Sequence, residues 1–485
     1  MEFQKIKLHR SEKNRAAVTQ ITLDDDYNVP DYRQDIVKVI KERGELRFDE
    51  VKAMEGAAWI KGSLVFKVLY RSDKQEGKIS CLRGEIPFQE RLNMDGLSEY
   101  DAVHATGDME DLTIGVINSR KLNVRAVIVL TASSEKEVDE ELTCELSDGS
   151  SYEQNIVEKE ALKLLVVRRD ICRQKSEAVL PSSKPNIREI LWQSMQLRNV
   201  ESRLVEGKIR LSGEILVSIL YNDEEEGEHL SWYETTVPLD AQAECGVMED
   251  DCIWQVQMVP LTMELEVKPD YDGEERILVM ELALDTHIRI WKEEKIRLLT
   301  DLYSLQKEVK PVFRECPLER LLVKNAAKCR MTEQMELKED KEKVLQICSC
   351  EGKVLLERQE IKPDGVLAEG TVEVNILYIT PDDHMPVGAV QEIYPFSQLV
   401  EIPEMSAQAK VELDASLEQL SAVMLDQEHV EIRAAVRLDL IAFVQEVIQN
   451  IEEATESEPD LEMLRNRPGP VSYTHLRAHE TAANL

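Results

Sequence analysis

One stretch of nine residues occurs three times in this chain and constrains its fold more than any other feature. The copies run from Gly62 to Tyr70, from Gly213 to Tyr221 and from Gly370 to Tyr378. In each copy, every second residue after the glycine is apolar, and β-branched and aromatic types are frequent. Such alternation predicts a β-strand with one buried face. The other face is mixed, apart from a leucine directly before each tyrosine.

A proline follows each of these tyrosines at the same distance of 17 residues, at Pro87, Pro238 and Pro395. Since proline has no N–H for a sheet ladder, we expect Pro87 at a strand end or on an edge strand. The repeated tyrosines are expected to pack at strand ends, with their hydroxyls reaching the turn or water. The copies lie 151 and 157 residues apart. Solenoid repeats are far shorter, at roughly 20–50 residues, so the spacing indicates three tandem domains.

The length of 485 residues agrees with three domains, because a domain averages roughly 150 residues. We predict domains over residues 1–150, 155–308 and 309–456, followed by a linker and tail over 457–485. The expected fold is mainly β, with antiparallel sandwich-like domains. Each domain is expected to carry a short proline-led helix, from Pro30 to Ile40 in the first and from Pro185 to Leu191 in the second. This helix is absent or altered in the third domain, at Lys338 to Lys343.

The charge of the chain limits the partners that it can bind. It carries 94 acidic against 59 basic residues, a formal net charge of −35. Nucleic acid and anionic membrane surfaces require clustered Lys and Arg, and no basic stripe occurs. We therefore interpret the acidic residues mainly as a solvated surface and less as an acidic docking surface. The acidic stretch from Glu135 to Ser151 is the expected first linker.

The cysteines and the apolar runs favour a reduced, soluble protein. The nine cysteines are odd in number and form no CxxC, and Cys348 and Cys350 are too close together for zinc-knuckle spacing. Cys245 and Cys252 could oxidise or bind metal, but two reduced thiols are the favoured interpretation. No apolar run approaches the roughly 20 residues of a membrane span, and the first residues lack a secretory signal. We expect a cytoplasmic location.

A search for catalytic motifs names no residue. The sequence contains no GxSxG, P-loop, GxGxxG after a strand or HExxH. His287 is interpreted as a surface or packed residue of a strand. Glu281 and Asp285 could be proposed as an acid–base pair, but chance proximity explains such pairs in a chain with so many carboxylates. We predict no catalytic, cofactor-binding or metal-binding residue, and no cofactor.

The end of the chain differs from everything before it. His475 and His479 stand four apart and could share a helix face as metal ligands. However, the segment around them resembles a translated sequencing adapter, and we exclude it from the fold. The natural C-terminus is then expected to be missing.

The repeated units resemble a known family. The residues that carry the resemblance are Pro185, Ile187, Ile190 and Leu191, then Val205 to Lys208, Gly213 to Tyr221, and Val237 to Leu239. Together they resemble the SPOCS domain, the spore-coat-assembly domain. Three copies followed by a charged linker are similar to the SipL/SpoVID-like spore morphogenetic proteins. The resemblance is best in the second unit and weakest in the third.

The resemblance implies a non-enzymatic scaffold in spore coat assembly, on the mother-cell side of the forespore surface. Its implied partners are coat and morphogenetic proteins. In the family, a C-terminal LysM module docks onto the stage IV sporulation ATPase, and here adapter-like sequence begins at about Pro468, where that module should start. No family site residue carries over, and no oligomeric state is predicted. Two alternatives stay open: a carbohydrate-active enzyme, or a ligand-binding β-array with an acidic cleft.

Overall fold

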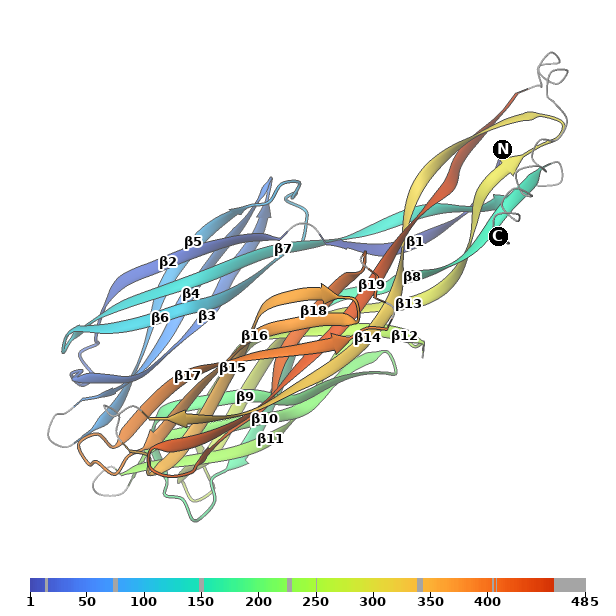
Figure 1. Cartoon of the computed structure of the whole chain (residues 1–485). Helices are drawn as coiled ribbons and strands as arrows, with labels where there is room; N and C mark the ends of the chain where they lie inside the picture. The colour runs from blue at the N-terminus through green and yellow to red at the C-terminus, as the bar shows by residue number, and fades with distance from the viewer. Residues whose placement is uncertain are drawn as a thin grey trace.

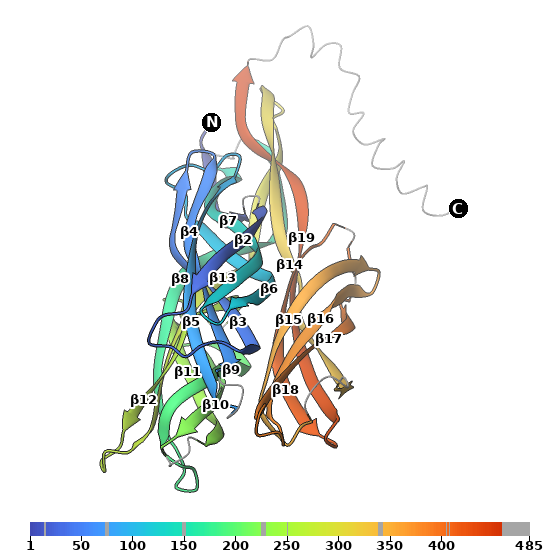
Figure 2. The ribbon, with the colours of Figure 1, turned by 90° about the vertical axis from the view of Figure 1, so that its left-hand side faces the viewer.

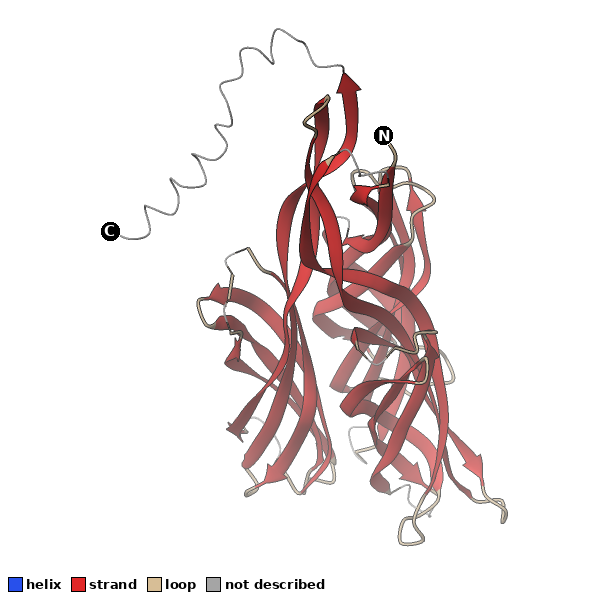
Figure 3. Cartoon of the chain, turned by 90° about the vertical axis from the view of Figure 1, so that its right-hand side faces the viewer, coloured by secondary structure: helices blue, strands red, loops and turns tan. Residues whose placement is uncertain are grey.

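The structure is a computed structural model that describes residues 1–13, 16–72, 77–147, 152–224, 229–249, 251–337, 343–403, 405–406 and 408–457. Every regular element in these ranges is a β-strand, and none of these ranges contains a helix (Figure 3). The strands fall into three units that repeat one plan.

The units take up the chain in order. The first contains β1 (Phe3–Lys13), β2 (Ala17–Asn28), β3 (Lys38–Met54), β4 (Ala57–Arg71), β5 (Ile79–Asn93), β6 (Val103–Asn118) and β7 (Lys121–Leu146). The second contains β8 (Glu153–Val179), β9 (Ile187–Val205), β10 (Lys208–Asp223), β11 (Leu230–Glu244), β12 (Cys252–Pro269) and β13 (Glu275–Tyr303). The third contains β14 (Glu308–Glu336), β15 (Gln346–Lys362), β16 (Gly365–Ile379), β17 (Val387–Glu401), β18 (Lys410–Met424) and β19 (His429–Ser457).

Each unit contains two antiparallel sheets. The first, which we call the inner sheet, has the repeated strand at its centre, in the orders β3-β4-β5, β11-β10-β9 and β15-β16-β17. The second, the outer sheet, has the last long strand of the unit at its centre, in the orders β2-β7-β6, β12-β13-β8 and β14-β19-β18. The repeated strand is therefore central in its sheet, and its alternating apolar residues face the other sheet.

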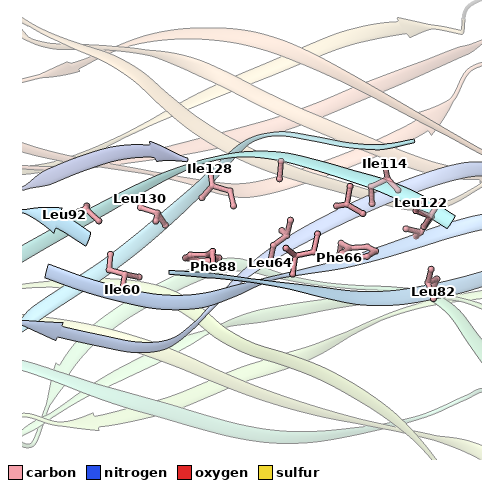
Figure 4. Packing of buried hydrophobic residues seen from close by; sticks show 14 of the residues in the cluster. Ile60, Leu64, Phe66, Leu82, Phe88, Leu92, Ile114, Leu122, Ile128 and Leu130 are labelled. Atoms are coloured by element: carbon pink, nitrogen blue, oxygen red, sulfur yellow. The ribbon is translucent and has the colours of Figure 1, made fainter. Parts of the chain in front are cut away.

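The core of each unit lies between its two sheets. In the first unit, Leu64 and Phe66 of β4 pack in one buried cluster with Leu122 and Ile128 of β7 (Figure 4). Corresponding strands supply the clusters of the second and third units. Each such side chain contributes about 1.5–3 kcal/mol when it is fully removed from water. Every unit therefore has a buried core of its own.

The long strands continue beyond these cores and form a stem. Within it, β1 pairs with Glu135–Leu146 of β7, the start of β8 with the end of β13, and the start of β14 with the end of β19. The three ribbons meet at one end of the molecule (Figure 1), and the view in Figure 2 shows the ribbon of β14 and β19 projecting above the units. Two buried clusters hold the ribbons together, and each includes side chains from all three.

The structure corrects the prediction of a proline-led helix in each unit. The segment after Pro30 is one turn, closed by the hydrogen bond from Arg33 N to Pro30 O (2.9 Å), and β3 then begins at Lys38. In the second unit, Lys184 N donates to Pro181 O (2.9 Å), and β9 begins at Ile187. Alternation along the following strand outweighs the helix-start signal of the proline. The third predicted position, residues 338–342, lies outside the described residues.

The predicted first linker, from Glu135 to Ser151, is also wrong over the part that the structure describes, while residues 148–151 lie outside the described residues. Residues Glu135–Leu146 belong to β7 and pair with β1 along their length. Acidic side chains suit this ribbon because Lys and Arg of the facing strand pair with them, as Lys5 does with Glu141 (4.0 Å). The histidines of the tail, His475 and His479, lie outside the described residues.

The repeated glycines stand opposite β-bulges. The neighbouring strand shifts register between Phe48 and Glu50 opposite Gly62, and between Leu356 and Arg358 opposite Gly370. The bulge pushes a backbone carbonyl toward the glycine, so that a Cβ on Gly370 would lie 2.2 Å from Leu355 O. The same Cβ would lie 2.9 Å from the ring of Phe396, the residue after Pro395. The glycine is thus required by lack of space beside the bulge.

Gly370→Ala is expected to lower the stability of the third unit by about 1–3 kcal/mol, the usual cost of overpacking. Hydrogen exchange of the β16 amides measures the change. Gly115→Ala on β6 is the matched control, because its Cβ would meet nothing within 4 Å. Equal protection of β16 in both variants would contradict the bulge argument.

Candidate functional site

Three leucines join the units to one another. Leu69, Leu220 and Leu377 each precede the repeated tyrosine, on the face of the inner sheet that points away from the unit's own core. They lie in one buried cluster, to which Trp192 also belongs. We call this cluster the hub, and its members are Leu69, Ile79, Leu191, Trp192, Leu220, Cys348, Leu377 and Val387. The leucine on an otherwise mixed face was the sequence signal for it.

The repeated tyrosines point to the opposite side, into the units. Tyr70, Tyr221 and Tyr378 are fully buried. The hydroxyl of Tyr70 donates to Gln34 O (3.1 Å), and that of Tyr221 donates to Pro185 O (3.1 Å). Each of these two hydroxyls thereby ties the end of the central strand to the turn that precedes the inner sheet. Pro87, Pro238 and Pro395 lie on β5, β11 and β17, which are edge strands of the inner sheets.

Two arginines that sequence reasoning missed hold the same turns. The Arg120 guanidinium donates to Arg33 O (2.7 Å) and Pro30 O (2.9 Å). Arg276 donates to Pro181 O (2.7 Å) and Lys184 O (3.0 Å) in the second unit. Each arginine stands two residues before the first buried apolar residue of the unit's last strand, Leu122 or Leu278, whereas Glu428 has this position before Val430 in the third unit. That recurrence was the available signal.

A buried ion cluster joins all three units beside the hub. The Glu351 carboxylate of β15 faces Lys41 Nζ (3.5 Å) and Arg43 Nη1 (3.2 Å), both on β3. The indole N–H of Trp192 on β9 donates to the same carboxylate at 3.0 Å. The side chains of Lys41 and Glu351 are only 6% and 12% exposed. Burial opposes ionisation of Glu351, but the two cations outweigh it and hold its pKa below the usual value.

A cleft of about 870 Å³ opens next to this cluster. The first unit lines it with Ile40–Leu46 of β3 and Gly107–Leu112 of β6, and the third mainly with residues of β15, β16 and β17. The second unit contributes Ser194–Leu197 of β9. The cleft is thus assembled by the arrangement of the units, and no single unit contains it.

Carboxylates dominate the charge of the cleft lining. They are Glu42, Glu45, Glu110, Asp111, Glu336, Glu351, Glu373 and Glu392, against the cations Lys41, Arg43 and Lys353. Burial raises the pKa of Glu42, while that of Glu351 is lowered. A glycosidase-like mechanism needs both a proton donor and an accessible carboxylate. Glu351 is engaged by two cations and an indole, so it is not available as a catalytic carboxylate.

A second polar cluster lies where the stem meets the units. Glu135 of β7 pairs with His287 Nε2 of β13 at 2.9 Å and accepts a hydrogen bond from Ser11. Burial opposes the ionisation of Glu135, but these hydrogen bonds prevail and lower its pKa to about 2. Burial, with Arg169 and His287 nearby, lowers the pKa of His104 to about 4. His287 therefore bridges the first and second units, rather than facing solvent.

The remaining candidates from the sequence have separate partners. Glu281 forms an exposed pair with Lys175 (2.7 Å), and Asp285 pairs with Arg169 (3.2 Å), so the two carboxylates are engaged with different cations. Burial raises the pKa of the Cys348 and Cys350 thiols to about 12, which disfavours the reactive thiolate. Cys245 and Cys252 are buried and free. Within the described ranges, no group of three or more His, Cys, Asp or Glu could hold a metal ion.

Comparison with known proteins adds a family match. A family model described as "SipL, SPOCS domain" matches residues 35–117, 186–268 and 343–425. Each match covers the inner sheet and the outer-sheet strand that follows it, β6, β12 or β18. The long strands that build the stem lie outside the three matches.

The other comparisons contribute little. No curated protein matches the chain. Among solved structures, the ferric yersiniabactin uptake receptor FyuA from Yersinia pestis is 8% identical over 92% of this chain and 81% of its own, with a TM-score of 0.11. That score is too low to support an argument. No helix in the described ranges is long and apolar enough to cross a membrane.

Proposed function

Because the chain belongs to the SipL, SPOCS domain family, which is linked to spore coat assembly, we propose that it is a non-enzymatic scaffold of the endospore coat. In this role it links coat proteins to the morphogenetic ATPase on the forespore surface. The proposed location is the mother-cell cytoplasm at that surface. The proposed domains are residues 1–150, 155–308 and 309–456.

The observation that carries the proposal is the joining of three similar units at both the hub and the stem. The hub buries leucines from all three inner sheets, and the stem clusters combine side chains from all three ribbons. Two separate buried contacts fix the units relative to one another far better than flexible linkers do. A protein that spaces several partners requires such fixed geometry.

The test is a pull-down from lysate of sporulating cells, with the whole chain as bait and a tag-only bait as control. A second bait carries a family LysM module joined after residue 457. Mass spectrometry then identifies coat morphogenetic proteins and the sporulation ATPase. We expect the first bait to recover coat proteins, and the second bait to recover the ATPase as well.

Each alternative result has a definite meaning. Recovery of coat proteins only by the bait with the LysM module would assign the three units a spacer role and overturn their proposed role in binding coat proteins. Recovery of neither class by either bait would overturn the scaffold proposal altogether.

A further inference from the structure

The cleft between the units contains carboxylates that form no ion pair with any residue that the structure describes. Within the described ranges, Glu336, Glu373 and Glu392 form no ion pair, and Glu373 only accepts a hydrogen bond from Asn375 (2.7 Å). The cations of the lining are already paired. Lys41 and Arg43 face Glu351, and Lys353 Nζ lies 3.0 Å from Asp108. The cleft therefore has an excess of negative charge that a cationic ligand would neutralise.

A buried hydroxyl in the same cleft has no hydrogen-bond partner in the part of the chain that the structure describes. Ser194 is 2% exposed, and its Oγ forms no hydrogen bond with any described residue. It lines the cleft on the face of β9 that also carries Trp192 and Gln196, whereas Met195 points into the core of the second unit. Burying a hydroxyl without a hydrogen bond costs free energy, which a ligand group in the cleft would recover.

The cleft also offers backbone and apolar surface. β3 and β17 are edge strands of their inner sheets, and they line the cleft with Ile40–Leu46 and Ala389–Glu392. An edge strand can pair with an added extended segment. Apolar lining side chains such as Met109 and Leu417 lie between the charged ones. Such a mixture suits a peptide with alternating basic and apolar residues.

The carboxylates of the cleft are spread over several strands, and this distribution favours an extended cationic segment over a single metal ion. No group of three or more potential ligands in the described ranges could hold a metal ion, and the acidic residues of the lining lie on β3, β6, β14, β15, β16 and β17. We propose that this cleft binds an extended Lys- or Arg-rich segment of a partner protein. The inference rests on the proposed scaffold function, for which it names the chemistry of one partner.

Fluorescence anisotropy with the whole chain tests the proposal. The probe is a labelled peptide of alternating lysine and valine, and the comparison peptide has glutamate in place of lysine. We expect only the lysine peptide to bind, and added salt to weaken it. Glu373→Gln with Glu392→Gln should reduce its affinity about 5- to 30-fold, from two partly exposed charge pairs. The matched control is Asp383→Asn with Glu401→Gln, in the same unit but outside the cleft lining.

Ser194→Ala separates binding from folding. Because its hydroxyl has no partner among the described residues and is costly to bury, its loss should leave the unfolding midpoint as high as in the wild type or higher, while it weakens binding of the lysine peptide. Three results overturn the proposal: equal binding of both peptides, equal loss in the control pair, or full displacement of the peptide by spermine at matched charge. The last would assign the cleft to a free polyamine. None of these results alters the recovery of coat proteins, so failure here is distinct from failure of the scaffold function.

Discussion

Glu351→Gln is expected to lower the free energy of unfolding by about 3–5 kcal/mol, the usual cost of breaking a buried ion pair. The substitution keeps the size of the side chain but leaves Lys41, whose side chain is 6% exposed, without its counter-ion. The loss falls on the contact among the three units, since Lys41, Trp192 and Glu351 come from different units. Denaturant unfolding and hydrogen exchange of β3, β9 and β15 measure it.

Glu360→Gln is the matched control for this variant. Glu360 is on the same strand and forms an exposed pair with Lys362 (2.6 Å), so its loss should change little. Adding Lys41→Met to the Glu351→Gln variant should restore part of the stability, because it removes the buried uncompensated charge. A wild-type unfolding midpoint in the Glu351→Gln variant would contradict this account.

The ion pair of Lys41 and Glu351 predicts that the free energy of unfolding depends on pH. The folded pKa of Glu351 lies below its ordinary value of 4.5. Ionised Glu351 therefore stabilises the fold at pH above 4.5, and this contribution is lost as the pH falls below that value. In the Glu351→Gln variant, the hydrogen-exchange protection of the β15 amides should lose this part of its dependence on pH.

The second large effect is expected in the stem, from Asn450→Ala. The amide of Asn450 on β19 accepts from Thr143 N (2.8 Å) and donates to Thr143 O (2.9 Å) and Leu299 O (3.0 Å). One buried side chain thus joins the ribbons of all three units. Its removal leaves buried backbone groups unpaired, at roughly 1–3 kcal/mol for each group, so we expect a loss of about 3 kcal/mol.

Hydrogen exchange of the Thr143 amide reports this loss directly, because its N–H is one of the groups left unpaired. Gln449→Ala is the control, since the side chain of Gln449 is exposed and, among the described residues, donates a hydrogen bond to Glu315 (3.1 Å) alone. If the two variants protected the stem amides equally, the three-way role of Asn450 would be refuted.

Much of the strand content could be predicted from alternation alone. The runs from Gly213 to Tyr221 and from Leu278 onward alternate because one face is buried in the core of the unit, and the structure has them as β10 and β13. The predicted helices were wrong because the segment after Pro30 is a single turn, and in the second unit the corresponding turn begins at Pro181 and ends before Pro185. Arg120 and Arg276, which are far away in the sequence, hold those turns. Their recurrence before the last long strand marks the two positions but does not reveal which turn each arginine contacts.

The candidate site could not be predicted because it depends on how the units meet. Glu351 resembles any other carboxylate in the sequence until β3 and β9 place two cations and an indole around it. Leu220 was visible as an exception on a mixed face, but its contact with Leu69 and Leu377 is set by the arrangement of three sheets. Sequence periodicity describes the faces of one strand and carries no information about such long-range contacts.

The stem gives the molecule a polarity. β1 begins and β19 ends at its tip, while the turns held by Arg120 and Arg276 lie at the far end of the units (Figure 1). Any module attached after Ser457 therefore leaves from the tip. If such a module anchors the protein to a surface, the long axis stands away from that surface and the far turns point outward. Partners bound at the far turns would then be held away from that surface by the length of the molecule.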